Sequence, residues 1–226
     1  IALAKKYQMP AVAMTDTNNL FGALEFALTA KEAGVQPIIG CQIQITSDLC
    51  NRNNETDTLI LLVQNQKGYQ NLLKIVSHAY LNGKEKESPQ IDFPTLSQWT
   101  EGLIALTGGF QGGLAKRLAR GIEGRDYLKV LHSLFKDHLY IEISRQGILT
   151  PEEEILENSL IDLAYIENLP LVATNEAFFP DPALYEAHDA LLCIAEGTYV
   201  NEVNRRRLTP DHSFKSPKEM ESLFAD

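Results

Sequence analysis

Residues 10–26, PAVAMTDTNNLFGALEF, form the stretch that decides the fold. Ala11–Thr15 is a short apolar run of the kind that forms a buried strand. Polar residues follow it, and Phe21–Ala33 then carries apolar side chains at helical spacing and stops at Gly34. A strand, a polar turn and a helix in this order are typical of one step of a β/α fold.

The same alternation continues along the chain. Further strands are predicted at Pro37–Thr46, Thr58–Gln64, Gly102–Thr107, His138–Ser144 and Pro170–Thr174. Further helices are predicted at Gly68–Leu81, Gly113–Ala119, Arg125–Phe135, Pro151–Ile166 and Pro182–Ala195. Because strands and helices alternate, we expect a mostly parallel sheet. No glycine-rich turn of the dinucleotide-binding or P-loop kind follows any strand, so the sequence favours a β/α barrel.

Polar segments interrupt or follow the alternation. Asp48–Asp57 and Asn82–Gln90 are expected to be surface loops. Glu196–Pro217 is polar and irregular, which indicates a linker, and Pro217–Phe224 is predicted to be a short helix.

These features divide the chain into a barrel domain over residues 1–195 and a linker with the start of a following domain over residues 196–226. The chain does not begin with Met and opens inside a helical pattern. We therefore expect it to be a fragment of a longer protein.

Composition excludes several classes of protein. The chain has 226 residues, of which 44% are hydrophobic, enough for a buried core. No apolar run approaches the roughly 20 residues that span a bilayer, so we expect no membrane partner. The net charge of −10 opposes autonomous binding to nucleic acid. Cys41, Cys50 and Cys193 are widely spaced in apolar surroundings, which predicts reduced thiols and a cytoplasmic protein.

Reactive groups of a β/α barrel lie just past the carboxyl ends of its strands. Among these positions only Asp16 and Glu176 are carboxylates, and none is a His, so a metal site here is weak or absent. Asp16 could be a ligand or base, or could cap the following helix.

Cys41 is predicted to pack in the core, and the five histidines are predicted to have no ligand role. Arg205, Arg206 and Arg207 could contact DNA phosphates or a partner's acidic face, or be a solvated part of the linker.

The strand-end segments carry a resemblance to a known family. Residues 10–26 with 36–40, and then 68–72, 102–108, 140–143, 171–175, 187–189 and 215–217, resemble the PHP (polymerase and histidinol phosphatase) domain of bacterial DNA polymerase III alpha subunits. The resemblance covers essentially the whole chain. It implies a distorted seven-stranded β/α barrel whose first strand would lie upstream of Ile1, between Ala11–Thr15 and Pro170–Thr174.

The sequence departs from the family's metal-binding pattern at most positions, although Asp16 keeps its place. The departures are Thr17 in place of a His, Gln42 in place of a Glu, Gly109 in place of a common Cys, Gln146 in place of a His, and Glu176 with Phe178 in place of Asp-x-His. Threonine and glutamine are weak neutral ligands and phenylalanine cannot coordinate a metal. The resemblance therefore implies a degenerate metal site and no cofactor in this chain.

The function implied by the resemblance is that of a non-catalytic domain at the amino terminus of a replicative DNA polymerase. The parent would be a magnesium-dependent nucleotidyltransferase whose palm aspartates lie outside this chain, and the chain alone would be inactive. Its partners would be the other domains of the alpha subunit, the proofreading exonuclease, other replicase subunits and, through the parent, DNA. One alternative is an active metal-dependent PHP phosphoesterase with an unusual ligand set built from Asp16, Glu176 and histidines upstream of Ile1. The other is a small-molecule binding barrel, which would need a deep apolar pocket.

Overall fold

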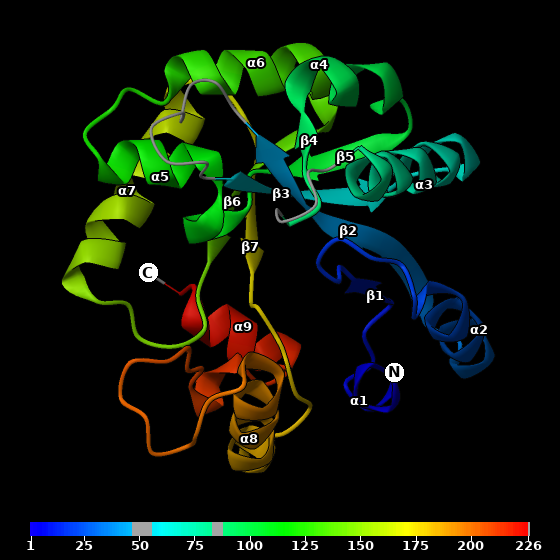
Figure 1. The fold of residues 1–226 in the computed structure, drawn as a ribbon, viewed down its shortest axis with the longest axis vertical. Helices are drawn as coiled ribbons and strands as arrows, with labels where there is room; N and C mark the ends of the chain where they lie inside the picture. Colours follow the sequence, from blue (N-terminus) through cyan, green and yellow to red (C-terminus); the bar gives the residue numbers. More distant parts are fainter. Residues whose placement is uncertain (47–55, 83–87, 226) are drawn as a thin grey trace. The chain divides into compact units, whose positions relative to one another are not determined.

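The computed structural model describes residues 1–46, 56–82 and 88–225, which fall into two compact units (Figure 1). Unit 1 comprises Ile1–Ile143 and Pro151–Val172, and unit 2 comprises Ser144–Thr150 and Ala173–Asp226. Unit 2 thus contains residues on both sides of the boundary predicted after residue 195.

Some predicted features lie outside the described residues. They include Cys50, residues 48–55 of the first predicted loop and residues 83–87 of the second.

The described residues form a seven-stranded sheet, and every strand predicted from the sequence is present within two residues of its expected ends. The strands are β1 (Ala11–Met14), β2 (Gln36–Thr46), β3 (Thr56–Val63), β4 (Ile91–Asp92), β5 (Leu103–Leu106), β6 (Leu139–Ser144) and β7 (Leu171–Thr174). Their order is β1-β2-β3-β5-β6-β7, with β4 added on β2. The strands β1 and β7 therefore stand at the two ends of the order, as predicted, and β4 is a strand that the sequence did not reveal.

The prediction of a mostly parallel sheet is wrong in the middle of the sheet. Strands β1 and β4 pair with β2 in parallel, and β5 and β6 are also parallel, but β3 runs antiparallel to both β2 and β5. A parallel pairing needs a crossover of about a dozen residues or more, and β2 ends at Thr46 while β3 begins at Thr56, so the chain between them is too short for a parallel crossover.

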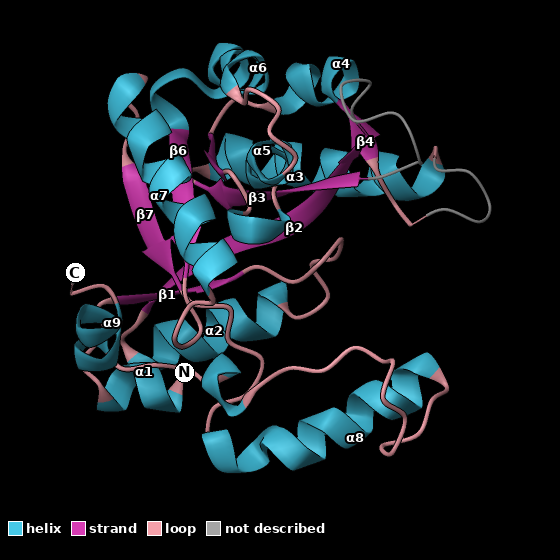
Figure 2. Ribbon diagram, turned by 90° about the vertical axis from the view of Figure 1, so that its left-hand side faces the viewer, coloured by secondary structure: helices cyan, strands magenta, loops and turns pink. Residues whose placement is uncertain are grey.

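The helices agree closely with the predicted ones, except that the short helix at Phe93–Leu96 was not predicted. They are α1 (Ala2–Lys6), α2 (Ala23–Ala33), α3 (Gln66–Leu81), α4 (Phe93–Leu96), α5 (Gly113–Ala119), α6 (Arg125–Phe135), α7 (Pro151–Ile166), α8 (Tyr185–Glu196) and α9 (Pro217–Leu223). In unit 1, helices α3 and α5 contact β3 and helix α6 contacts β5, and Figure 2 shows them beside the curled sheet. This is the predicted α/β class, with a curled sheet. No described helix has both the length and the hydropathy that a bilayer crossing requires.

Helix α3 starts in close contact with the turn that precedes β5. The side chain of Asn65 caps the helix by accepting a hydrogen bond from the Gly68 N–H at 3.0 Å, and Asn71 Nδ2 donates to the Glu101 carbonyl at 2.9 Å. A Cβ atom at Gly68 would overlap the carbonyl group of Gly102, whose own φ is +77°. Two glycines therefore let these backbones touch.

A buried ion pair joins β3 to α5 inside the apolar core of unit 1. Arg117 Nη1 lies 3.0 Å from Asp57 Oδ2 and donates to the Gly113 carbonyl at 2.6 Å, and the Tyr127 ring lies 3.9 Å from the guanidinium. All three side chains are almost fully buried. The prediction that Asp57 belongs to a surface loop is therefore wrong, because β3 begins at Thr56, two residues before the predicted strand, and includes Asp57.

Candidate functional site

The polar turn after β1 lies along β2 and brings three of the predicted site residues together in unit 1. The Gln42 N–H donates to the Asp16 carbonyl at 3.1 Å, and Thr17 forms a bridge with Gln42. Asp16 and Thr17 are both exposed. Helix α2 has Gly22 as its N-cap, with no side-chain capping bond, so the interpretation of Asp16 as a helix cap is wrong.

Cys41 lies beside this turn and packs in the core, as predicted. Its Sγ contacts the Gln42 carbonyl at 3.5 Å. Burial raises the pKa of the Cys41 thiol to about 11, so the sulfur is protonated at neutral pH. A protonated thiol is a poor metal ligand and a poor nucleophile, which leaves Cys41 a structural role.

The loop after β5 contributes no side-chain ligand to the candidate site. Gly109 is buried, and the Gly108 N–H donates to Glu142 Oε2 at 3.0 Å. The Glu142 N–H in turn donates to Thr107 Oγ1 at 2.9 Å. Glu142 is a buried carboxylate on β6 that sequence reasoning missed, although its place inside the apolar run of a strand was a signal. Here it holds the backbone of the loop.

In unit 2, the predicted residue Phe178 lies among imidazole and guanidinium groups. Its ring centroid is 5.7 Å from that of His188 and 6.0 Å from that of His212, and the Arg206 guanidinium lies 5.7 Å from it. The Phe178 N–H also donates to the His212 carbonyl at 2.9 Å. Gln146 is occupied elsewhere, because its Nε2 donates to Ser144 Oγ at 3.2 Å.

The two histidines around Phe178 do not form a metal-binding group. Burial lowers the pKa of His212, whose Nδ1 also lies 3.2 Å from the Thr209 N–H donor as part of a helix cap. Across the described parts of the chain, no three His, Cys, Asp or Glu side chains converge on a common point.

The three arginines of the predicted linker have different surroundings. Arg205 makes a bidentate ion pair with Asp189 of α8, with both distances 2.6 Å. Arg207 Nη2 donates to the carbonyls of Val200 and Glu202 at 3.2 and 3.0 Å, while Arg206 lies over the Phe178 ring. Within unit 2 the segment is thus bound to α8, and Asp189 is the anchoring residue that sequence reasoning missed.

We expect Asp189→Asn to change how stability depends on pH. The hydrogen bond from Arg205 holds the pKa of Asp189 below its usual value. A carboxylate with a lowered folded-state pKa stabilises the fold above its unfolded pKa of about 3.9 and loses that effect as pH falls through the folded value. Between about pH 7 and pH 3, the melting temperature should fall more steeply for the unsubstituted chain than for the variant. The control is Glu186→Gln, at an exposed position of α8. If the melting temperatures of the unsubstituted chain and of the Asp189 variant fall in parallel with pH, the ion pair does not cause the pH dependence.

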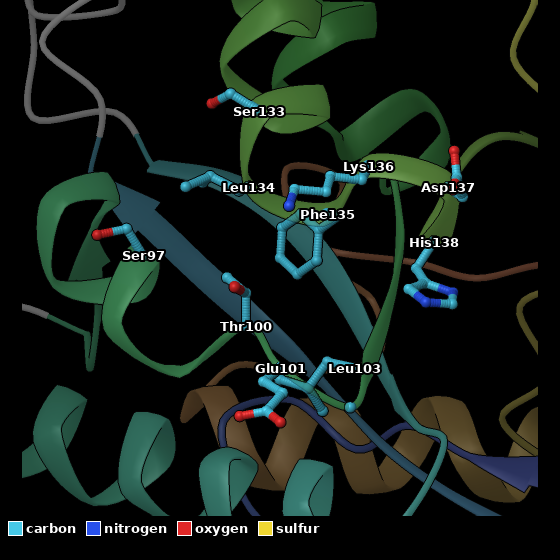
Figure 3. Close-up of a pocket in the computed structure, with 11 residues that line it drawn as sticks. Ser97, Thr100, Glu101, Leu103, Ser133, Leu134, Phe135, Lys136, Asp137 and His138 are labelled. Atoms are coloured by element: carbon cyan, nitrogen blue, oxygen red, sulfur yellow. The ribbon is translucent and has the colours of Figure 1, made fainter.

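Unit 1 contains a cleft of about 580 Å³ at the amino ends of β5 and β6 (Figure 3). Its charged residues are Glu101, Lys136 and Asp137, with His138 beside them, and all are exposed. It lies at the opposite end of β5 from Gly109. The cleft is therefore separate from the position that Gly109 takes in the predicted metal centre, and its mixed charges point to no single class of ligand.

A second, apolar groove of about 540 Å³ lies between the segment that leads into α2 and one face of α3, also in unit 1. Its lining includes Leu20, Phe21, Leu73, Tyr80 and Leu81. Phe21 and Leu81 are 89% and 82% exposed, which is unusual for large apolar side chains. Exposed apolar patches of this kind often mark binding surfaces.

Comparison with known proteins finds relatives along the whole chain. The DNA polymerase III subunit alpha of Caulobacter vibrioides is 43% identical over 229 residues, covering 99% of this chain and 20% of that protein. The protein of the same description from Rickettsia bellii is 37% identical, covering all of this chain and 19% of that protein. The one from Escherichia coli K12 is 35% identical, covering 96% of this chain and 19% of that protein. The chain therefore spans about a fifth of the length of these relatives.

Structure and family comparisons add two findings. A solved structure from Bifidobacterium adolescentis, whose description names a metal-dependent phosphoesterase, has a TM-score of 0.46 and 12% identity, covering 77% of this chain and 79% of that one. The PHP domain family matches residues 1–146, which is more than half of the chain. This chain therefore belongs to the PHP domain family.

Proposed function

We propose that this chain is the PHP domain of a DNA polymerase III alpha subunit, and that its metal centre is degenerate. In this proposal the domain supports DNA synthesis by its parent and does not hydrolyse phosphoesters itself. The observation that carries the proposal is Phe178, which stands where the family pattern has a metal-binding His and packs against His188 and His212. A phenyl ring at a ligand position blocks coordination there.

The other ligand positions support the same conclusion. In unit 1, Asp16 is accompanied by the neutral side chains of Thr17 and Gln42, and Gly109 offers no side chain. In unit 2, the Gln146 amide donates a hydrogen bond to Ser144 Oγ. Glu176 is the carboxylate of the expected set in this unit. Hydroxyl and amide oxygens are weak ligands for zinc, manganese or iron. This donor set does not fit the metal centre of an active PHP enzyme.

The relatives, described as DNA polymerase III subunit alpha, support the wider part of the proposal. The parent would be a cytoplasmic DNA-directed DNA polymerase that uses magnesium on residues outside this chain. Residues 1–195 would be the PHP domain and residues 196–226 would lead into the polymerase. DNA would be bound through the parent. Because Arg205 and Arg207 are engaged locally, Arg206 is the strongest candidate of the three for contact with DNA or a partner.

We expect the purified chain to hold substoichiometric zinc, manganese and iron, and to release no phosphate from a phosphomonoester. Elemental analysis and a phosphate-release assay on protein prepared without chelator test this expectation. The control is Asp16→Asn with Glu176→Gln, which should match the unsubstituted chain in both measurements. Two or more metals per chain that disappear in this double variant, together with phosphate release, would establish the alternative of an active phosphoesterase.

We also propose that the apolar groove of unit 1 binds the proofreading exonuclease subunit. The groove is concave and uncharged along its lining, as expected for a site that takes apolar side chains of a separate protein. Phe21→Asp and Leu81→Asp should each weaken binding about tenfold or more, because central apolar anchors contribute most of the energy of such contacts.

Titration of the exonuclease subunit onto the unsubstituted and variant chains measures this effect. Ile122→Asp, at a half-exposed apolar position away from the groove lining, is the control and should bind normally. Equal affinities for all chains would place the exonuclease elsewhere.

A further inference from the structure

Exposed apolar side chains occupy the last turns of α8 and the turn that follows it. They are Leu191, Ile194, Tyr199, Val200 and Val203, which are between 56% and 85% exposed. We call these five residues the α8 apolar surface. They all belong to unit 2, in the orange part of the ribbon in Figure 1.

The turn within this surface has a fixed conformation. The Glu202 N–H donates to the Tyr199 carbonyl at 3.0 Å and closes a four-residue turn. The Val200 carbonyl accepts from Arg205 Nη2 at 3.1 Å and from Arg207 Nη2 at 3.2 Å, and Arg207 also bonds the Glu202 carbonyl. Two guanidinium groups therefore hold the backbone of a turn that displays apolar side chains.

The turn is also bound to the helix beside it. Arg205 reaches Asp189 of α8 through two 2.6 Å contacts, and its side chain is only 3% exposed. The helix, the arginine and the Val200 carbonyl form one chain of contacts. Ordering an exposed segment costs conformational entropy, and a surface ordered in advance binds a partner at lower cost.

We propose that the α8 apolar surface is an intramolecular docking surface for the polymerase part of the parent polypeptide. This inference rests on the proposed function. The relatives are about five times as long as the segment that they share with this chain, so under the proposed function a large partner lies on the same polypeptide. A covalently attached partner has a high effective concentration, so a small apolar patch is enough to bind it.

The chemistry of the surface favours this occupant over DNA. All five members of the surface are uncharged, and the guanidinium groups of Arg205 and Arg207 bond Asp189 and backbone carbonyls. Glu202 also lies within the turn. A phosphate backbone needs accessible cations, whereas an interdomain contact needs apolar area.

Hydrogen–deuterium exchange of the 226-residue chain and of the full-length parent tests the docking. Peptides covering residues 191–203 should exchange several-fold more slowly in the full-length protein than in the 226-residue chain. Equal exchange rates in the two proteins would overturn the proposal. Protection that appears only after the exonuclease subunit is added would overturn it in favour of that partner.

Substitution gives an independent measurement. Val203→Asp and Ile194→Asp should leave the melting temperature of the 226-residue chain unchanged, because both side chains are exposed there, but should lower that of the full-length parent by several degrees. The matched control is Ile155→Asp on α7, which is 69% exposed and should change neither protein. Equal melting temperatures for all full-length variants would overturn the proposal, as would concentration-dependent dimers of the short chain that Val203→Asp abolishes.

Primer extension by the unsubstituted full-length protein separates this inference from the proposed function. A protein that extends primers but shows no protection of residues 191–203 keeps the proposed function and loses the docking surface. If residues 191–203 are protected but the protein does not extend primers, the surface contacts another domain, but that domain is not a polymerase. This result would overturn both the proposed function and the docking proposal.

Discussion

Asp57→Ala should lower the free energy of unfolding of this chain by about 3–5 kcal/mol, the usual cost of removing one partner of a buried ion pair. The substitution takes away the carboxylate that lies 3.0 Å from Arg117 Nη1, while the guanidinium stays buried against Tyr127. A buried guanidinium that loses a carboxylate at this distance cannot gain hydration in its place without opening the core. Urea denaturation followed by circular dichroism measures the difference.

Two further variants make the Asp57 result specific. Asp126→Ala removes an exposed carboxylate that lies 3.0 Å from Lys129 Nζ, and it should change the free energy of unfolding by less than about 1 kcal/mol. Asp57→Leu combined with Arg117→Met should recover most of the loss, because apolar residues of similar volume replace both charges. A loss below about 1 kcal/mol for Asp57→Ala would show that the pair does not stabilise the fold.

Gly68→Ala should destabilise unit 1 by about 3 kcal/mol, at the upper end of the usual cost of overpacking. The new methyl group would overlap the Gly102 carbonyl, which belongs to the backbone and cannot turn aside like a side chain. The first turn of α3 would have to move away from β5, and the Asn65 cap and the Asn71 bond to Glu101 would move with it. Urea denaturation again measures the effect.

Gly22→Ala is the matched control for Gly68→Ala. A Cβ atom at Gly22 would meet Met14 Sδ at 3.4 Å, an ordinary contact with a flexible side chain, and its φ of −82° suits any residue. This variant should unfold within about 1 kcal/mol of the unsubstituted chain. Equal stabilities of the two alanine variants would show that the contact between Gly68 and Gly102 relaxes at little cost.

The sequence was a good guide to the elements and a poor guide to the direction of β3. Apolar runs and helical spacing depend on local burial, so strands such as β6 and helices such as α6 were found almost to the residue. Whether a strand runs parallel or antiparallel depends on the connection before it. Strand β4 was missed because Ile91 and Asp92 are too few to show a periodic pattern.

The candidate site shows the same division between local and distant information. The family pattern marks Asp16, Thr17 and Gln42, and the structure brings them together through the bridge between Thr17 and Gln42. Pattern reasoning could not reveal Asp189, because its partner Arg205 lies sixteen residues away across a helix end. Nor could it reveal that Asp57 is buried, since only the packing of α5 on β3 encloses that carboxylate.

The reversed direction of β3 has a consequence for how the sheet assembles. Thr46 pairs with Thr56 in the antiparallel β2–β3 pair, whereas Ala11 pairs with Gln36 and Ala105 with Leu139 across longer stretches of chain. Bringing together residues that are close in the chain costs less chain entropy than bringing together distant ones. The antiparallel pair therefore gives the sheet a local nucleus. The slower parallel pairings of β1 and β6 can then be added to an edge that already exists.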